Sequence, residues 1–169
     1  MVKKTYCADF ETTSMSNLEQ DGTVRVWLWS LVSIDGEEMY GTTIDSFMAN
    51  LFRLRPKRVY FHNLRFDGSF IVDWLLKNNY IYGENFNCII SDMNVWYEIT
   101  LTVGKDTIKI WDSLKKFPEQ SVESIAKLYG IEGKKEKPYF EMYRPIDYKP
   151  TSEEIEYCIQ DSRIIARAI

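Results

Sequence analysis

The chain has 169 residues, of which 45% are hydrophobic and 15% aromatic, so it can bury one substantial core but not two. A formal net charge of −4 excludes a protein that holds duplex DNA by a broad basic face, because phosphate neutralisation needs clustered Lys and Arg. Three widely separated cysteines, with no C-x-x-C pair, predict neither a disulfide framework nor a zinc cluster. We therefore expect a single domain over residues 1–169, which grips any nucleic acid locally or through metal ions.

No stretch approaches the ~18 apolar residues of a membrane span, and no apolar signal region precedes the first strand-like segment. We predict a cytoplasmic protein without membrane contact, and a monomer by default. The last residues, Arg167-Ala168-Ile169, contain none of the Gly, Asn or Pro that usually end a helix. This end predicts a chain that is part of a longer parent.

The first half of the chain has the pattern of a β-meander followed by alternating helices and strands. Runs rich in β-branched and aromatic residues predict strands at Thr5–Phe10, Thr23–Ile34, Glu37–Thr42 and Arg58–His62. Apolar residues at helical spacing predict helices at Thr43–Leu54, which ends before Pro56, and at Asp67–Asn78, which begins at the Asp67-Gly68 step.

The second half continues the alternation. Strands are expected at Asn85–Asp92, Val95–Val103 and Thr107–Asp112. A short helix, a long polar loop and a final helix follow, at Gln120–Tyr129, Gly133–Tyr148 and from Thr151 to the end. Thr151 and Glu154 have the spacing of a capping box. The whole order predicts an α/β domain with a mixed central sheet flanked by helices.

Four acids carry the chemical interpretation. Asp9 and Glu11 stand at positions i and i+2 of a strand, so their side chains share a face, and two neighbouring carboxylates repel unless a cation lies between them. Asp67 follows a strand where a helix begins. Asp161 lies four residues after Tyr157, and both lie on one helix face.

Four acids from separate elements can supply the oxygen ligands of two Mg²⁺ or Mn²⁺ ions about 3.5–4 Å apart, the arrangement used for phosphodiester hydrolysis. Each acid alone also fits a solvated surface group, and Asp67 alone fits a helix N-cap. The prediction rests on their combination and order.

Three motifs in this order resemble the exonuclease motifs of polymerase proofreading domains: DFET at Asp9–Thr12, HNLRFDG at His62–Gly68 and YCIQD at Tyr157–Asp161. A closer resemblance is to the protein-primed family B DNA polymerases of small tailed phages. It is carried by Tyr60–Phe70, Asp112–Lys116 and Thr151–Glu154. The resemblance implies an RNase H-like exonuclease fold at the amino end of a polymerase, in the cytoplasm of a bacterial host if the protein is encoded by a phage.

The resemblance also implies a 3′→5′ exonuclease that hydrolyses single-stranded DNA 3′ ends to nucleoside monophosphates and proofreads during DNA replication. Asp9, Glu11, Asp67 and Asp161 would hold two divalent ions, Mg²⁺ or Mn²⁺, and Tyr157 would orient the attacking water. A tyrosine of ordinary pKa is neutral at pH 7, so it donates a hydrogen bond rather than acting as a strong base.

A family lysine that contacts the scissile phosphate falls nearest to Lys135, with Lys134 and Lys137 as alternatives, and a solvated lysine run remains open. A family tyrosine in the same loop falls on Phe140, close to Tyr139 and Tyr143.

The resemblance also implies which residues hold the single-stranded 3′ end, since those family positions map onto Thr12, Tyr60, His62, Asn63, Phe66, Phe70, Ser113 and Leu114. Aromatic faces and short polar groups suit such a strand, because stacking on bases tolerates any sequence. From periodicity alone, Tyr60 and Phe70 fit the core equally well, and His62 fits a hydrogen-bonded structural histidine.

Two other functions remain open. A ribonuclease can be built on the same four acids, but the histidine that such relatives carry in place of Tyr157 is missing, since the only histidine is His62 in the second motif. A non-catalytic module could bind single strands or dock onto a polymerase. It would have no reason to keep all four acids and the tyrosine.

Overall fold

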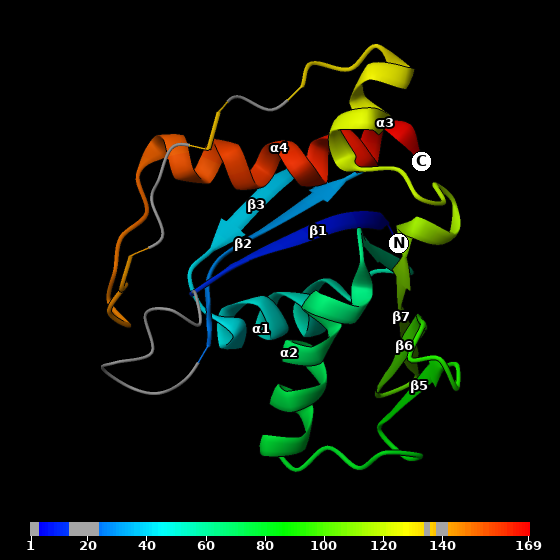
Figure 1. Ribbon diagram of the computed structural model, residues 1–169. Coiled ribbons are helices and arrows are strands. Elements are labelled where there is room, and N and C mark those ends of the chain that lie inside the picture. Colours follow the sequence, from blue (N-terminus) through cyan, green and yellow to red (C-terminus); the bar gives the residue numbers. More distant parts are fainter. Residues whose placement is uncertain (1–3, 14–23, 134–135, 138–141) are drawn as a thin grey trace.

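The computed structural model describes residues 4–13, 24–133, 136–137 and 142–169. Within them, seven strands form one sheet in the order β3-β2-β1-β4-β7-β6-β5 (Figure 1). The strands are β1 Thr5–Thr12, β2 Val26–Ser33, β3 Glu38–Gly41, β4 Arg58–Phe61, β5 Phe86–Ile90, β6 Trp96–Val103 and β7 Asp106–Asp112. The helices are α1 Ile44–Leu54, α2 Leu64–Lys77, α3 Val122–Tyr129 and α4 Ser152–Ala168, with a 3₁₀ turn at Ser113–Lys115.

The centre of the sheet is parallel and its two sides are antiparallel. β4 pairs in parallel with both β1 and β7, whereas β2, β3, β5 and β6 are added in antiparallel pairs. The predicted mixed sheet flanked by helices is thus confirmed. Because neighbouring parallel strands end at the same edge, whatever follows β1, β4 and β7 is gathered there.

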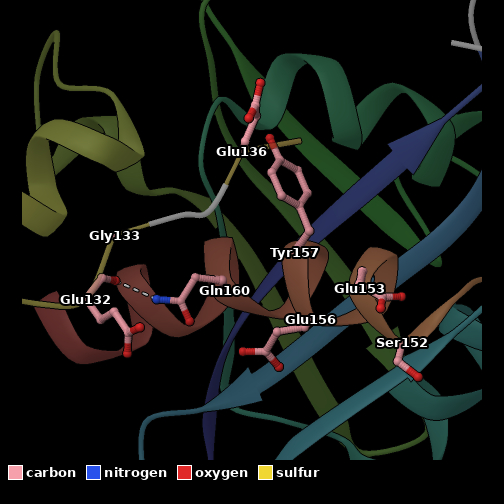
Figure 2. A pocket seen from close by; sticks show the side chains of 8 residues that line it. All are labelled: Glu132, Gly133, Glu136, Ser152, Glu153, Glu156, Tyr157 and Gln160. Carbon is pink, nitrogen blue, oxygen red and sulfur yellow. Dashed lines mark hydrogen bonds between the residues drawn. The ribbon is translucent and has the colours of Figure 1, made fainter. Parts of the chain in front are cut away.

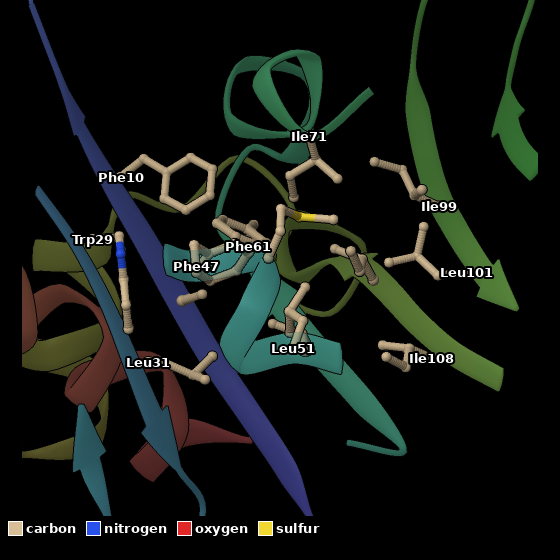
Figure 3. Packing of buried hydrophobic residues seen from close by; sticks show 14 of the residues in the cluster. Phe10, Trp29, Leu31, Phe47, Leu51, Phe61, Ile71, Ile99, Leu101 and Ile108 are labelled. Atoms are coloured by element: carbon tan, nitrogen blue, oxygen red, sulfur yellow. The ribbon is translucent and has the colours of Figure 1, made fainter. Parts of the chain in front are cut away.

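Helices cover both faces of the sheet (Figure 1). α1 and α2 lie on one face, and α4 crosses β1 and β2 on the other, with α3 beside it. On the α1 and α2 face, Phe10, Phe47 and Phe61 pack edge to face, with ring centroids 4.8 to 5.9 Å apart (Figure 3). Such pairs add about 0.5–1.5 kcal/mol each beyond the area they bury. The described part of the chain has no helix with both the length and the apolar character to cross a membrane.

One predicted boundary is wrong and changes the interpretation of an acid. α2 begins at Leu64 rather than at the Asp67-Gly68 step. The chain turns four residues earlier, at Asn63, whose backbone is left-handed with φ 72° and whose backbone N–H donates to Asp112 Oδ1 at 3.1 Å. Asn is among the few residues that tolerate this conformation. Asp67 therefore lies within the first turns of the helix and is not its cap.

The start of α4 follows the sequence prediction. Thr151 Oγ1 accepts a hydrogen bond from the Glu154 amide at 3.3 Å, and Glu154 Oε2 accepts one from the Thr151 amide at 2.8 Å. The capping box is confirmed. The final helix ends at Ala168, one residue before the last.

A buried ion pair anchors the amino end of α4, a role that the capping pattern alone did not predict for Glu154. Arg144 and Glu154 are 2% and 3% exposed, and Arg144 Nη2 lies 3.4 Å from Glu154 Oε1. The Tyr148 hydroxyl donates to Glu154 Oε2 at 2.9 Å, and the guanidinium lies 4.0 Å from the centre of the Trp27 ring. These contacts fasten the segment before α4 to β2.

Replacing Glu154 tests this anchor. We expect Glu154→Ala to lower the free energy of unfolding by about 3–5 kcal/mol, because it removes the carboxylate that compensates a buried cation. The exposed neighbour provides a matched control, since Glu153→Ala in the same turn should change stability by no more than about 0.5 kcal/mol. Urea unfolding followed by circular dichroism measures both, and equal effects would contradict the assignment.

Candidate active site

The first two acids lie near the carboxyl end of β1. Asp9 and Glu11 are half-buried and point to the α4 face, whereas Phe10 between them is in the core under α1. This alternation is the period of two of a strand. A register shift between Glu11 and Thr12 marks the point where β1 begins to leave β2.

Two serines hold α4 over these acids. Ser30 Oγ on β2 donates to the Cys158 carbonyl at 3.0 Å and shares a hydrogen bond of 2.7 Å with Ser162 Oγ. All of these groups are buried. The helix face that carries Tyr157 and Asp161 is therefore brought over β1.

The Cys158 thiol on α4 lies close to the two acids of β1. Its Sγ and carboxylate oxygens of Asp9 and Glu11 all lie within 4.8 Å of one another. Burial, and then the charges of Asp9, Glu11 and Asp161, raise the pKa of the Cys158 thiol well above its ordinary value. Acids from β1 and α4 thus surround one point.

Asp67 approaches the same point from α2. It is 4% exposed, and burial raises the pKa of its carboxyl well above the usual range, with a further rise from the charges of Glu11 and Asp112. Backbone amides of Asp67 itself and of Phe10 oppose the rise. Its Oδ1 is buried and has no hydrogen-bond partner among the described residues. A buried acid with an unsatisfied oxygen, facing other acids, is what a site for a cation requires.

The donor set fits hard divalent cations. All four predicted ligands are carboxylates, and Mg²⁺ and Mn²⁺ prefer oxygen. A cation placed among them would relieve the repulsion between Asp67 and Glu11 and satisfy the orphaned oxygen of Asp67.

A fifth acid, Asp112, was missed as a site residue. It is 5% exposed at the end of β7, and its Oδ1 accepts from the amides of Asn63 and Leu114, at 3.1 and 2.9 Å. It therefore ties the turn before α2 to the turn after β7. An acid followed by Ser at a strand end is a helix-cap signal that could have found it.

The residues that are predicted to bind single-stranded DNA lie mostly around the carboxyl ends of β1, β4 and β7. Phe66 is 50% exposed and contacts the half-buried Phe70 on α2, with ring centroids 5.7 Å apart. Thr12 and Leu114 are half-buried, and Asn63 is exposed.

Three other members of that set have structural contacts. Tyr60 is 1% exposed and packs edge-on against Trp111, so it belongs to the core on the α3 side. His62 Nε2 lies 2.8 Å from the Gln120 carbonyl, so this nitrogen donates, and Nδ1 lies 2.8 Å from Ser113 Oγ. The contacts of Tyr60 and His62 are therefore those of a core residue and of a hydrogen-bonded structural histidine. A contact of either residue with DNA stays a prediction.

Lys135 lies outside the described residues, as do Lys134, Tyr139 and Phe140. Lys137 is described and exposed. Tyr143 is half-buried, and its ring centre lies 5.9 Å from the Arg25 guanidinium carbon. The assignment of a phosphate-contacting lysine stays a prediction.

A cavity of about 450 Å³ opens beside Tyr157, between α4 and the segment that follows α3 (Figure 2). Gln160 Nε2 donates to the Glu132 carbonyl at 2.6 Å at one side of it. Four glutamates line it, and they would repel a phosphate group: Glu132, Glu136, Glu153 and Glu156. This cavity is therefore unfavourable for a phosphate group.

The comparisons with known proteins agree with this fold. The family model described as DNA polymerase type B, organellar and viral, matches residues 49–147. The DNA polymerase of Bacillus phage phi29 is 36% identical over 181 residues, which cover 100% of this chain and 30% of that protein. Structures of the phi29 polymerase complexed with single-stranded DNA and with primer-template DNA align with TM-scores of 0.86 and 0.87 at 35% identity, over 98% of this chain and 30% of theirs.

The chain belongs to the type B DNA polymerase family of organelles and viruses. Within it, the chain is homologous to the exonuclease-domain region of the phi29-type, protein-primed polymerases, and the predicted RNase H-like fold is confirmed. It spans about 30% of the length of these relatives.

The buried acid gives a test with a definite sign. The raised pKa of Asp67 means that the metal-free fold loses stability as pH rises from the unfolded carboxyl pKa of about 3.9 through the folded value. With EDTA at pH 7, Asp67→Asn should therefore be more stable than wild type by about 1–3 kcal/mol, because the neutral amide removes a buried charge that lies beside Glu11. The difference should shrink toward pH 4. Thermal unfolding at several pH values measures it.

Adding Mg²⁺ or Mn²⁺ should reverse the order, because only the wild type gains the free energy of metal binding. A variant that is less stable than wild type in EDTA at every pH would show that Asp67 is a satisfied structural group.

Proposed function

We propose that this domain is a two-metal-ion 3′→5′ exonuclease that removes nucleoside monophosphates from single-stranded DNA 3′ ends. The observation that carries the proposal is the convergence of acids from three elements. Carboxylate oxygens of Asp9 and Glu11 on β1 lie within 4.8 Å of the Cys158 thiol on α4, and the charges of both acids and of Asp161 raise its pKa. The Glu11 charge also raises the pKa of Asp67 on α2. A binding module would need no such buried repulsion.

The chain's own groups divide the work. Asp9, Glu11, Asp67 and Asp161 would hold Mg²⁺ or Mn²⁺, which when bound activate water and stabilise the leaving 3′ oxygen. The Tyr157 phenol would donate a hydrogen bond to the attacking water and so orient it. Its side chain points away from α4, on the side of the cavity where Glu136 lies, as Figure 2 shows.

The substrate follows from the exposed rings and from the charge. A chain with net charge −4 has little to hold a duplex, whereas Phe66 stands exposed near the acids as a stacking surface for an unpaired base. One relative is solved in complex with single-stranded DNA. In a longer polymerase chain, the domain would receive frayed primer ends and proofread them, with the polymerase domain as its partner.

The direct test is digestion of a 5′-labelled single-stranded deoxyoligonucleotide with Mg²⁺ or Mn²⁺. We expect a ladder that shortens from the 3′ end and disappears with EDTA or in the Asp9→Ala/Glu11→Ala variant. Tyr157→Phe should slow cleavage by up to about 100-fold, because a misplaced water loses that much, while metal binding persists. Paired 3′ ends should be cut more slowly than single strands.

Two outcomes would point elsewhere. Binding of the oligonucleotide without cleavage by any variant would support a non-catalytic module. Faster cutting of the matching ribo-oligonucleotide would support the ribonuclease.

A second test isolates the stacking surface. Phe66→Ala should weaken binding of a short single strand by about 1–3 kcal/mol, which is the loss of one stacked base, without changing the fold. Tyr82, an aromatic residue 60% exposed on a different surface, gives the matched control, and Tyr82→Ala should leave affinity unchanged. Fluorescence anisotropy in EDTA measures both without cleavage. Equal losses would assign the binding to general exposed aromatic surface.

A further inference from the structure

The Cys158 thiol has no part in the proposed hydrolysis, yet it lies at the acids. Its Sγ and carboxylate oxygens of Asp9 and Glu11 are within 4.8 Å of one another, and the side chain is fully buried. Sγ also lies 3.9 Å from the Asp9 carbonyl oxygen. A buried cysteine is commonly a small apolar group, and Trp27 and Leu28 pack around this one. Two carboxylates close to a thiol are not an apolar surrounding.

A second buried acid approaches the same strand segment. Asp67 is 96% buried, since it is 4% exposed, and its Oδ1 has no hydrogen-bond partner among the described residues. Its carboxyl accepts a hydrogen bond from the backbone amide of Phe10, which lies between Asp9 and Glu11 on β1. The buried carboxyl with this unsatisfied oxygen therefore lies at the strand segment that carries both acids.

Two carboxylates and one thiolate are a mixed oxygen and sulfur ligand set. Zn²⁺ accepts Cys at about 2.3 Å and carboxylate at about 2.0–2.2 Å, so ligand atoms in a tetrahedral site are about 3.5 Å apart. Starting from separations within 4.8 Å, the three atoms need to close by about 1.3 Å at most, which side-chain torsions can supply. Mg²⁺ gains little from sulfur, whereas Zn²⁺ and Cd²⁺ favour it.

We propose that Asp9, Glu11 and Cys158 form a site for a thiophilic divalent cation, Zn²⁺ or Cd²⁺, which overlaps the carboxylate site and competes with Mg²⁺ there. Binding forms one bond between sulfur and the metal ion, and the thiol proton leaves to solvent, with no change of oxidation state. The competition with Mg²⁺ rests on the proposed function. The metal site itself does not.

Cadmium provides a readout that does not depend on activity. Titration of the folded domain with Cd²⁺ should produce the ultraviolet charge-transfer absorption of a cadmium–thiolate bond, saturating at one ion. Cys158→Ser should abolish it, and Asp9→Asn/Glu11→Gln should weaken Cd²⁺ binding at least tenfold. Cys88→Ser is the matched control, since Cys88 lies on β5 away from the acids, and it should keep the full band.

Circular dichroism checks that each variant folds, and Cys158→Ala replaces Cys158→Ser if the buried hydroxyl prevents folding. A wild type without the band overturns the proposal. So does a band that persists without Cys158, which would place the metal on Cys7 or Cys88.

Cleavage assays separate this inference from the proposed function. If Mg²⁺ supports cleavage, micromolar Zn²⁺ should inhibit the wild type at least tenfold more strongly than the Cys158→Ser variant. A cadmium band in a protein that never cleaves DNA would overturn the nuclease and leave the metal site standing. Cleavage equally sensitive to Zn²⁺ with and without Cys158 would overturn the competition.

Discussion

The two faces of β1 are the constraint on which the site depends. β1 lies in the middle of the sheet, antiparallel to β2 and parallel to β4, so its register is fixed on both sides. Phe10 is locked into the aromatic core, and the period of two then leaves Asp9 and Glu11 no choice of face. A one-residue slip would bury both acids under α1 and expose the phenylalanine. The positions of the two acids are thus fixed by the same packing that stabilises the fold.

The remaining parts are fastened around that strand by polar contacts rather than by apolar packing alone. Ser30 joins β2 to α4, and Asp112 joins the turn after β7 to the turn before α2. The Arg144–Glu154 pair fixes the amino end of α4. Each of these groups is buried, so each is held in one geometry by the cost of leaving it unsatisfied. Positions of acids that repel one another can be maintained only on such a rigid frame.

Burying these acids side by side lowers the stability of the fold. Asp67 is buried beside Glu11 with an oxygen that no described residue satisfies. Strain of this kind is typical of functional sites, where local rules are broken and the surrounding structure compensates. The thiol of Cys158 lies at the same place, so the proposed binding of a thiophilic ion depends on one residue beyond the acids.

The sequence by itself determined the order of the strands and helices, the capping box of α4 and the identity of the candidate acids. These features depend on neighbouring residues, whose periodicity and cap chemistry are readable locally. The tertiary structure decided that α2 starts at Leu64, because the turn at Asn63 is held by Asp112 from a distant strand. It also decided that Tyr60 and His62 have buried partners, and that Cys158 meets Asp9 and Glu11. Residues about 150 positions apart come together only through the sheet order and the packing of α4, and no local pattern encodes that proximity.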